Sequence, residues 1–194
     1  MDIKYDFKLD TSTLILESGS YYITSMTGKH VSRPSFVEGD FSLQPIIFLP
    51  EENESSLWPR WQIEKLSDGS YLLMSKAAFT LAVDGKVFAS IASIADTSLP
   101  PAAWIITARP EHGPDIYSIQ IRNTEQEPYG WVSLGSISDT QLCVRPHIVP
   151  INNPTQLPSN QLFRIVSIHN PYPADEKLND ATLEPATQEE FESF

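Results

Sequence analysis

Short runs in which apolar and polar residues alternate occur along most of the chain, and this period of two is typical of half-buried β-strands. The clearest run is Trp61-Gln62-Ile63-Glu64. Its order of aromatic residue, variable residue and isoleucine returns at Trp104-Ile105-Ile106-Thr107 and Phe163-Arg164-Ile165-Val166. Because Trp61, Trp104 and Phe163 hold equivalent positions in these runs, we predict that all three lie in the core.

A second pattern, a tyrosine followed two residues later by an apolar residue, also recurs along the chain. It begins at Tyr21, Tyr71 and Tyr117, so successive copies are 50 and 46 residues apart. A repeat of this length suits about four short strands. We therefore predict an all-β chain folded as a β-trefoil, with three pseudo-repeats of about four strands. Trp131 lies outside the repeated positions and is predicted to be partly exposed.

Two Asp-Gly pairs predict tight hairpins, because both residue types tolerate a positive φ. They are Asp68-Gly69 and Asp84-Gly85. By contrast, residues 26–40 hold few alternations before Ile46-Ile47-Phe48-Leu49 restores a strand. Loops longer than about 12 residues are uncommon within a domain and often serve binding. We therefore expect this polar segment to be functional.

The length and composition of the chain suit one domain. A chain of 194 residues that is 41% hydrophobic can form one well-buried core. We place the β-domain at residues 16–168, after an N-terminal extension at 1–15. Pro146 to Pro158 contains four prolines, which indicate an irregular excursion instead of a central strand. Residues 169–194 are acidic and lack apolar patterning, so we predict a disordered tail.

The formal net charge of −12 at pH 7 bears on the choice of partners. An acidic surface repels nucleic acid and anionic membranes, so neither is expected to bind.

We see no secretory signal and no run of about 18 apolar residues, and therefore expect a cytoplasmic protein. We also expect a monomer. Cys143 has apolar neighbours and is predicted to be a buried strand thiol.

The residue types that catalysis or metal binding requires do not occur in a known arrangement. The sequence has no Gly-x-Ser-x-Gly elbow and no glycine-rich phosphate loop. The histidines lack metal-binding spacing and are expected in turns and at the surface. They are His30, His112, His147 and His169. We therefore predict no enzyme activity, no metal and no cofactor.

Several short segments stand in a recognisable order between residues 16 and 168. They are Leu16 to Ile23, Val31-Ser32-Arg33, Phe41 to Pro45, Trp61 to Lys65, Asp84 to Ala89, Gly130-Trp131-Val132, Val144-Arg145-Pro146 and Pro158 to Phe163. Together they resemble the fungal serine protease inhibitors of the cospin type, which come from mushrooms. The resemblance implies a β-trefoil that inhibits trypsin-like serine endopeptidases through the loop between its second and third strands. In this chain, that loop falls within residues 25–40.

The protease-binding loop implied by the resemblance has two basic candidates for the inserted side chain, Arg33 and Lys29, because a trypsin-like pocket has an aspartate at its base. Pro34 restricts Arg33 to an extended backbone, which favours a preorganised loop, although trypsin-like enzymes disfavour an Arg-Pro bond. Alternatively, Arg33 is a surface residue balanced by Glu38 and Asp40. The complete predicted loop is Lys29, His30, Val31, Ser32, Arg33, Pro34 and Ser35.

Two other functions stay open at the level of the sequence. The first is a β-trefoil lectin, in which aromatic residues such as Trp61 would stack on sugars. The Gln-x-Trp repeats typical of ricin-like lectins are absent, since Gln62 follows Trp61, and the equivalent positions of the aromatic residues favour a core role. The second is an inhibitor of cysteine proteases that uses another loop.

Overall fold

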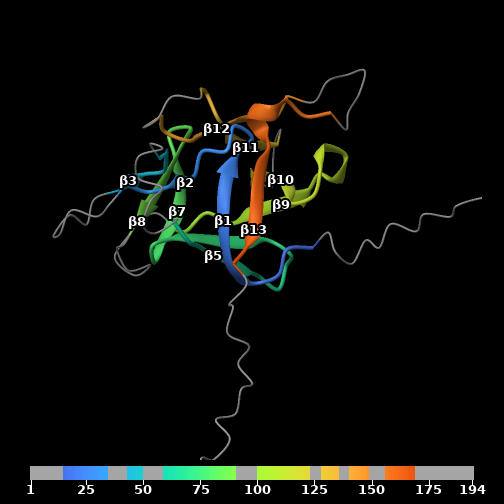
Figure 1. Cartoon of the computed structure of the whole chain (residues 1–194). Helices are drawn as coiled ribbons and strands as arrows, with labels where there is room; N and C mark the ends of the chain where they lie inside the picture. Colours follow the sequence, from blue (N-terminus) through green and yellow to red (C-terminus); the bar gives the residue numbers. More distant parts are fainter. Residues whose placement is uncertain are drawn as a thin grey trace, which may run out of the picture.

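The computed structural model describes residues 15–34, 43–49, 59–90, 100–122, 128–135, 140–148 and 156–168. Almost all of the predicted extension at 1–15 and the whole of the predicted tail at 169–194 lie outside these ranges. No helix in the described ranges is long and apolar enough to cross a membrane. The elements in Figure 1 are β1 (Gly19–Ser25), β2 (Val31–Ser32), β3 (Gln44–Pro45), β4 (Ile47–Phe48), β5 (Trp61–Lys65), β6 (Tyr71–Ser75), β7 (Ala78–Val83), β8 (Lys86–Ser90), β9 (Trp104–Ala108), β10 (Ile116–Ile121), β11 (Tyr129–Val132), β12 (Cys143–Pro146) and β13 (Phe163–Ser167), with the 3-10 helices η3 (Pro110–His112) and η4 (Ser159–Gln161).

Most strands belong to one antiparallel sheet that closes on itself. Neighbouring strands follow the order β11, β12, β8, β7, β6, β5, β1, β13 and β10, and β10 pairs back with β11 at Gln120 and Gly130. The result is a closed antiparallel barrel of nine strands. Strand β9 pairs with β10 and also meets β6 at Tyr71 and Trp104, while β2 and β4 form a small separate sheet.

The prediction of an all-β chain is confirmed, but the β-trefoil is corrected to this closed barrel. The recurring aromatic and tyrosine patterns mark individual strands, and such patterns are local. Closure depends instead on pairings between distant residues, such as Gln120 with Gly130 and Cys143 with Lys86. Period-two alternation assigns residues to the two faces of a strand and does not specify which strands become neighbours.

The core is organised around one tryptophan. The ring centroid of Trp131 lies 5.7 Å from that of Trp61, 5.5 Å from that of Trp104 and 5.6 Å from that of Phe163. All four side chains are 0% exposed, so the predicted core role of the three repeated aromatic residues is confirmed. The prediction that Trp131 is partly exposed is wrong. Each such aromatic contact is worth about 0.5–1.5 kcal/mol beyond the buried area.

Gly130 explains how Trp131 reaches the centre of the barrel. A Cβ atom at this position would lie only 2.5 Å from the carbonyl oxygen of Ile119 and 2.1 Å from Nε2 of His147. Only glycine therefore lets β11 approach β10 this closely. The close approach holds the next residue, Trp131, against the other core rings.

Both Asp-Gly hairpins are confirmed. Gly69 has φ +83° between β5 and β6, and Asp84 and Gly85 have φ 49° and 70° between β7 and β8. The carboxylate of Asp68 accepts hydrogen bonds from both the backbone N–H and the hydroxyl of Ser70, at 2.9 and 2.6 Å.

Cys143 is buried in β12 as predicted.

Candidate functional site

The turn that joins β1 to β2 is closed by hydrogen bonds among its own residues. The backbone N–H of Ser25 donates to the carbonyl of Lys29 at 2.9 Å, and that of Gly28 donates to the carbonyl of Ser25 at 3.0 Å. The Ser25 hydroxyl lies 2.9 Å from that of Thr27 and accepts from the Lys29 N–H at 3.2 Å. Gly28 supplies the required positive φ of 87°. The turn is therefore closed by local hydrogen bonds at the end of β1, where Ser25 pairs with Phe163 of β13.

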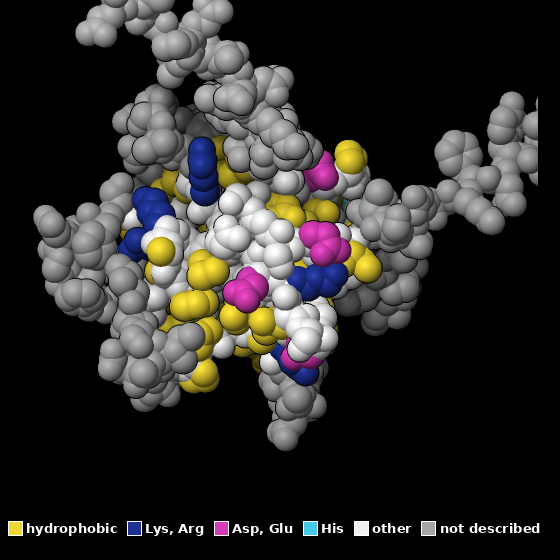
Figure 2. All heavy atoms as spheres, turned by 90° about the horizontal axis from the view of Figure 1, so that it is seen from below, with side chains coloured by type: hydrophobic (Ala, Val, Ile, Leu, Met, Phe, Trp, Pro, Cys, Tyr) yellow, Lys and Arg dark blue, Asp and Glu magenta, His cyan; other side chains and the backbone are white. Residues whose placement is uncertain are grey.

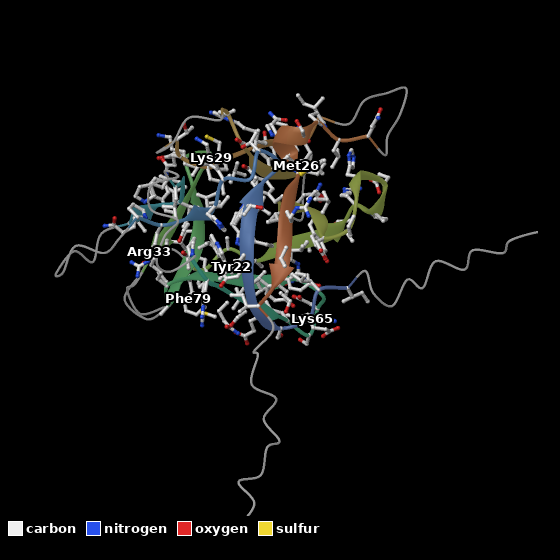
Figure 3. All side chains as sticks on the ribbon, in the orientation of Figure 1. Tyr22, Met26, Lys29, Arg33, Lys65 and Phe79 are labelled. Carbon is white, nitrogen blue, oxygen red and sulfur yellow. The ribbon has the colours of Figure 1, made fainter. Side chains whose placement is uncertain are left out.

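The same turn is the exposed part of the predicted loop in the described ranges. Met26, Thr27 and Gly28 are exposed, and Lys29 is partly exposed. In Figure 3, Met26 and Lys29 lie towards the end of the barrel at which β1 finishes, whereas Lys65 lies at the opposite end. A basic side chain is thus presented beside an apolar one on a preformed turn.

The next three predicted loop residues, His30, Val31 and Ser32, face the interior, and none is more than 6% exposed. The carbonyl of Val31 accepts a hydrogen bond from Nε1 of Trp61 at 2.7 Å. The hydroxyls of Ser32 and Ser75 lie 2.9 Å apart. The expectation that His30 lies at the surface is wrong, because its ring packs edge-on against that of Tyr22, with the centroids 6.2 Å apart, and its backbone pairs with Thr24.

Arg33 also lies inward, with only 5% of its surface exposed. Its Nη2 atom donates to the carbonyl of Lys76 at 2.9 Å, and its backbone N–H points to the Ser75 hydroxyl at 3.4 Å. Burial lowers the pKa of its guanidinium. Lys76 returns the contact, since its Nζ donates to the carbonyl of Pro34 at 3.5 Å. The last predicted loop residue, Ser35, lies outside the described ranges.

The turn between β6 and β7 supports Arg33 at some conformational cost. Lys76 and Ala77 have φ values of 49° and 63°, in the left-handed region that L-residues rarely adopt. This backbone turns the Lys76 carbonyl towards the guanidinium. Burial lowers the pKa of Lys76, and the neighbouring Arg33 lowers it further. No sequence signal identified this support, because its acceptor is a backbone atom 43 residues from Arg33.

The described residues do not support sugar stacking or metal binding. Trp61, Trp104 and Phe163 are fully buried and cannot stack on a sugar. Within the described ranges, no group of three or more His, Cys, Asp and Glu side chains could hold a metal ion. His147 was expected at the surface but is 8% exposed, and burial lowers its pKa to about 4.

A family of peptidase inhibitors matches nearly the whole described domain. Its family model, described as peptidase inhibitor I66, covers residues 14–167. The molecule is therefore a peptidase inhibitor and not an enzyme. The chain belongs to the peptidase inhibitor I66 family.

Two solved structures put this family assignment in context. A proteinase inhibitor from Coprinopsis cinerea is 30% identical, with a TM-score of 0.68, and the match covers 79% of this chain and 99% of that one. It supports the resemblance to fungal protease inhibitors, while the narrower cospin type stays a prediction. A salivary protein from Culex quinquefasciatus of a cysteine- and tryptophan-rich family is 12% identical, with a TM-score of 0.51, and the match covers 80% of this chain and 96% of that one. That likeness concerns the fold alone. No curated protein sequence matches the chain.

Proposed function

We propose that this peptidase inhibitor acts on trypsin-like serine endopeptidases and binds them as a monomer through residues 25–40. The observation that carries the proposal is the partial exposure of Lys29 on a turn fixed by its own hydrogen bonds. A basic side chain on such a turn suits a pocket that has an aspartate at its base. Little further ordering is needed on binding, and this favours affinity.

The residues of the loop have different roles in this proposal. Lys29 enters the specificity pocket, while His30, Val31 and Ser32 hold the turn against the barrel. Arg33 is the second candidate for the pocket, followed in the chain by Pro34 and Ser35. To reach an enzyme, its guanidinium would leave the Lys76 carbonyl, and a hydrogen bond of a charged group is worth about 1.5–3 kcal/mol. This cost makes Lys29 the better candidate.

The experiment is a titration of trypsin, chymotrypsin, subtilisin and papain with the wild-type protein and with Lys29→Ala, Lys29→Arg and Arg33→Ala. We expect inhibition of trypsin. Lys29→Ala should raise its inhibition constant at least 30-fold, as expected for a central interface residue worth about 2 kcal/mol or more. Lys29→Arg should inhibit nearly as well as the wild type, because the pocket also accepts arginine.

Lys65→Ala is the matched control, since Lys65 is a partly exposed lysine at the opposite end of the barrel. That end, turned towards the viewer in Figure 2, mixes apolar, acidic and basic side chains. Loss of inhibition in Arg33→Ala alone would transfer the role to Arg33. Unchanged inhibition in both alanine variants would exclude the loop, and inhibition of papain alone would move the target to cysteine proteases.

A further inference from the structure

A groove runs beside the outer edge of β7. It is bordered by residues 81–83 of β7, by residues 100–103 before β9, and by Ile121 and Arg122 at the end of β10. Every one of these residues except Arg122 is apolar. The volume of the groove is about 380 Å³, within the range of about 300–1,000 Å³ that is usual for ligand sites. The groove therefore combines apolar walls with one charged side chain.

The edge of β7 that borders this groove carries unpaired backbone groups at Ala82. Val83 and Lys86 flank the two-residue loop between β7 and β8 and form a hydrogen-bonded pair, so Ala82 directs its N–H and C=O away from β8. Thr80 has the same direction, and its carbonyl accepts a hydrogen bond from the N–H of Ala102 at 2.9 Å. Within the described ranges, no hydrogen bond joins either backbone group of Ala82 to another residue.

The wall opposite Ala82 does not complete this edge. Pro100 and Pro101 have no N–H to donate to the Ala82 carbonyl, so the pairing between this wall and β7 stops at Ala102. A strand edge with free backbone groups is where an extended peptide adds as a further strand. The main chain of such a peptide pairs with the edge, while every second side chain enters the groove.

Arg122 has hydrogen-bond donors to spare for an occupant of the groove. Its Nη1 atom donates to Oδ2 of Asp68, whose other carboxylate oxygen accepts from Ser70. A guanidinium has five N–H donors, and in the described part of the chain Nε and Nη2 of Arg122 make no hydrogen bond. The side chain is 45% exposed. A second carboxylate can therefore bind the guanidinium through both of these atoms while Asp68 stays in place.

We propose that this groove binds an extended segment of a partner protein, which pairs with β7 at Ala82 and presents an apolar side chain to the walls and an acidic one to Arg122. Residues 81–83 are about 10 Å of strand, so about three to five residues of the partner fit. The groove is separate from the proposed peptidase contact. Asp68, which pairs with Arg122, lies in the turn after β5 at the Lys65 end of the barrel, whereas Met26 and Lys29 lie at the other end (Figure 3).

The test is a titration of the full ¹⁵N-labelled chain with the peptide acetyl-Glu-Thr-Val-Thr-Glu-amide, followed by two-dimensional NMR at about 0.15 M salt, which screens the net charge. A glutamate at each end serves either strand direction, and its side chain shares one face with the valine. We expect the amide signals of Ala82, Ile121 and Arg122 to shift. A twin peptide with glutamines in place of the glutamates should bind at least about 10-fold more weakly. A twin with N-methylated central residues should bind several-fold more weakly, because it cannot donate to the edge.

Three variants test the role of Arg122. Arg122→Gln should raise the dissociation constant of the acidic peptide at least about 10-fold and change that of the glutamine twin little. Asp68→Asn keeps an Asn-Gly turn and removes the competing carboxylate, so it should bind the acidic peptide more tightly. The matched control is Arg164→Gln, because Arg164 is an exposed arginine on β13 outside the groove, and its dissociation constant should equal that of the wild type.

Three results would overturn the inference. The first is the absence of shifts at these amides with about 5 mM acidic peptide. The second is equal binding of all three peptides, which would show that neither strand pairing nor the guanidinium recognises the segment. The third is a shift of the same amides with protein concentration alone, which would assign the edge of β7 to a second copy of this chain. Peptide binding is the readout throughout, so a failure to inhibit trypsin would overturn the proposed function and leave this inference standing.

Discussion

The β1–β2 turn and the segment that follows it are neighbours in sequence but are supported in opposite ways. The hydrogen bonds that shape the turn join residues within Ser25 to Lys29. The segment from His30 to Pro34 is held by partners far along the chain, among them Trp61, Ser75 and Lys76. The turn is bonded locally and exposes residues 26–28, whereas the segment that follows it is largely buried and bonded to distant strands.

The turn presents the exposed side chains, and the segment that follows it holds the chain to the barrel. A turn that closes on itself can change its exposed side chains at little cost in folding free energy. The buried segment cannot, because a substitution there leaves a distant polar group without its partner. A functional loop of this kind can therefore change its specificity at residues 26–29 while residues 30–34 stay fixed.

Acid should affect both regions equally, because His147 supports the barrel on which both depend. Burial is the main cause of its low pKa of about 4, and the nearby Arg109 adds to the effect. In the unfolded state, the imidazole has a pKa near 6.5. Between about pH 4 and pH 6.5 the unfolded state therefore binds more protons than the folded state. Stability therefore falls as the pH drops from about 6.5 to about 4, by at most about 3 kcal/mol.

Urea unfolding of the wild type and His147→Gln at pH 7 and pH 4.5 measures this contribution. Glutamine is expected to reduce the acid sensitivity, because it does not titrate. Amide hydrogen exchange should accelerate together in the turn and in residues 30–34. An equal loss of stability in both proteins would show that His147 is not the cause.

Ser75→Ala should destabilise residues 30–34 and leave the β1–β2 turn unchanged. Ser75 is fully buried, and its hydroxyl meets that of Ser32 at 2.9 Å and the backbone N–H of Arg33 at 3.4 Å. Removing it leaves the buried Ser32 hydroxyl without this partner, at a cost of about 1–3 kcal/mol. Exchange should accelerate at residues 30–34 and stay unchanged in the turn, as measured by denaturant unfolding and hydrogen exchange.

Ser20→Ala is the control for this prediction. The hydroxyl of Ser20 donates to Oε1 of Gln62 at 3.1 Å in an exposed position, so its loss should change stability by less than about 0.5 kcal/mol. Equal effects of the two substitutions, or faster exchange in the turn of Ser75→Ala, would contradict the distinction between the two regions.

What could be predicted from the sequence was local. Asp84-Gly85 defined its own turn, and the alternation around Trp61 identified a buried aromatic residue. The barrel closure could not be predicted, because it depends on a missing Cβ at Gly130 and on pairing between distant strands. The inward position of Arg33 could not be predicted for a related reason. Its acceptor is the backbone carbonyl of Lys76, which no side-chain pattern reveals.

Thr27→Ala tests the local hydrogen bonds of the β1–β2 turn and has the smallest expected effect on folding. Thr27 is exposed, so losing its hydrogen bond with the Ser25 hydroxyl should change stability by less than about 0.5 kcal/mol. The turn would then have to be ordered on binding, which costs about 0.5–1.5 kcal/mol per side chain and weakens trypsin inhibition about two- to tenfold. Thr27→Ser keeps the hydroxyl and should inhibit like the wild type. If Thr27→Ala and Thr27→Ser inhibited equally, the internal hydrogen bonds of the turn would not be what prepares Lys29 for binding.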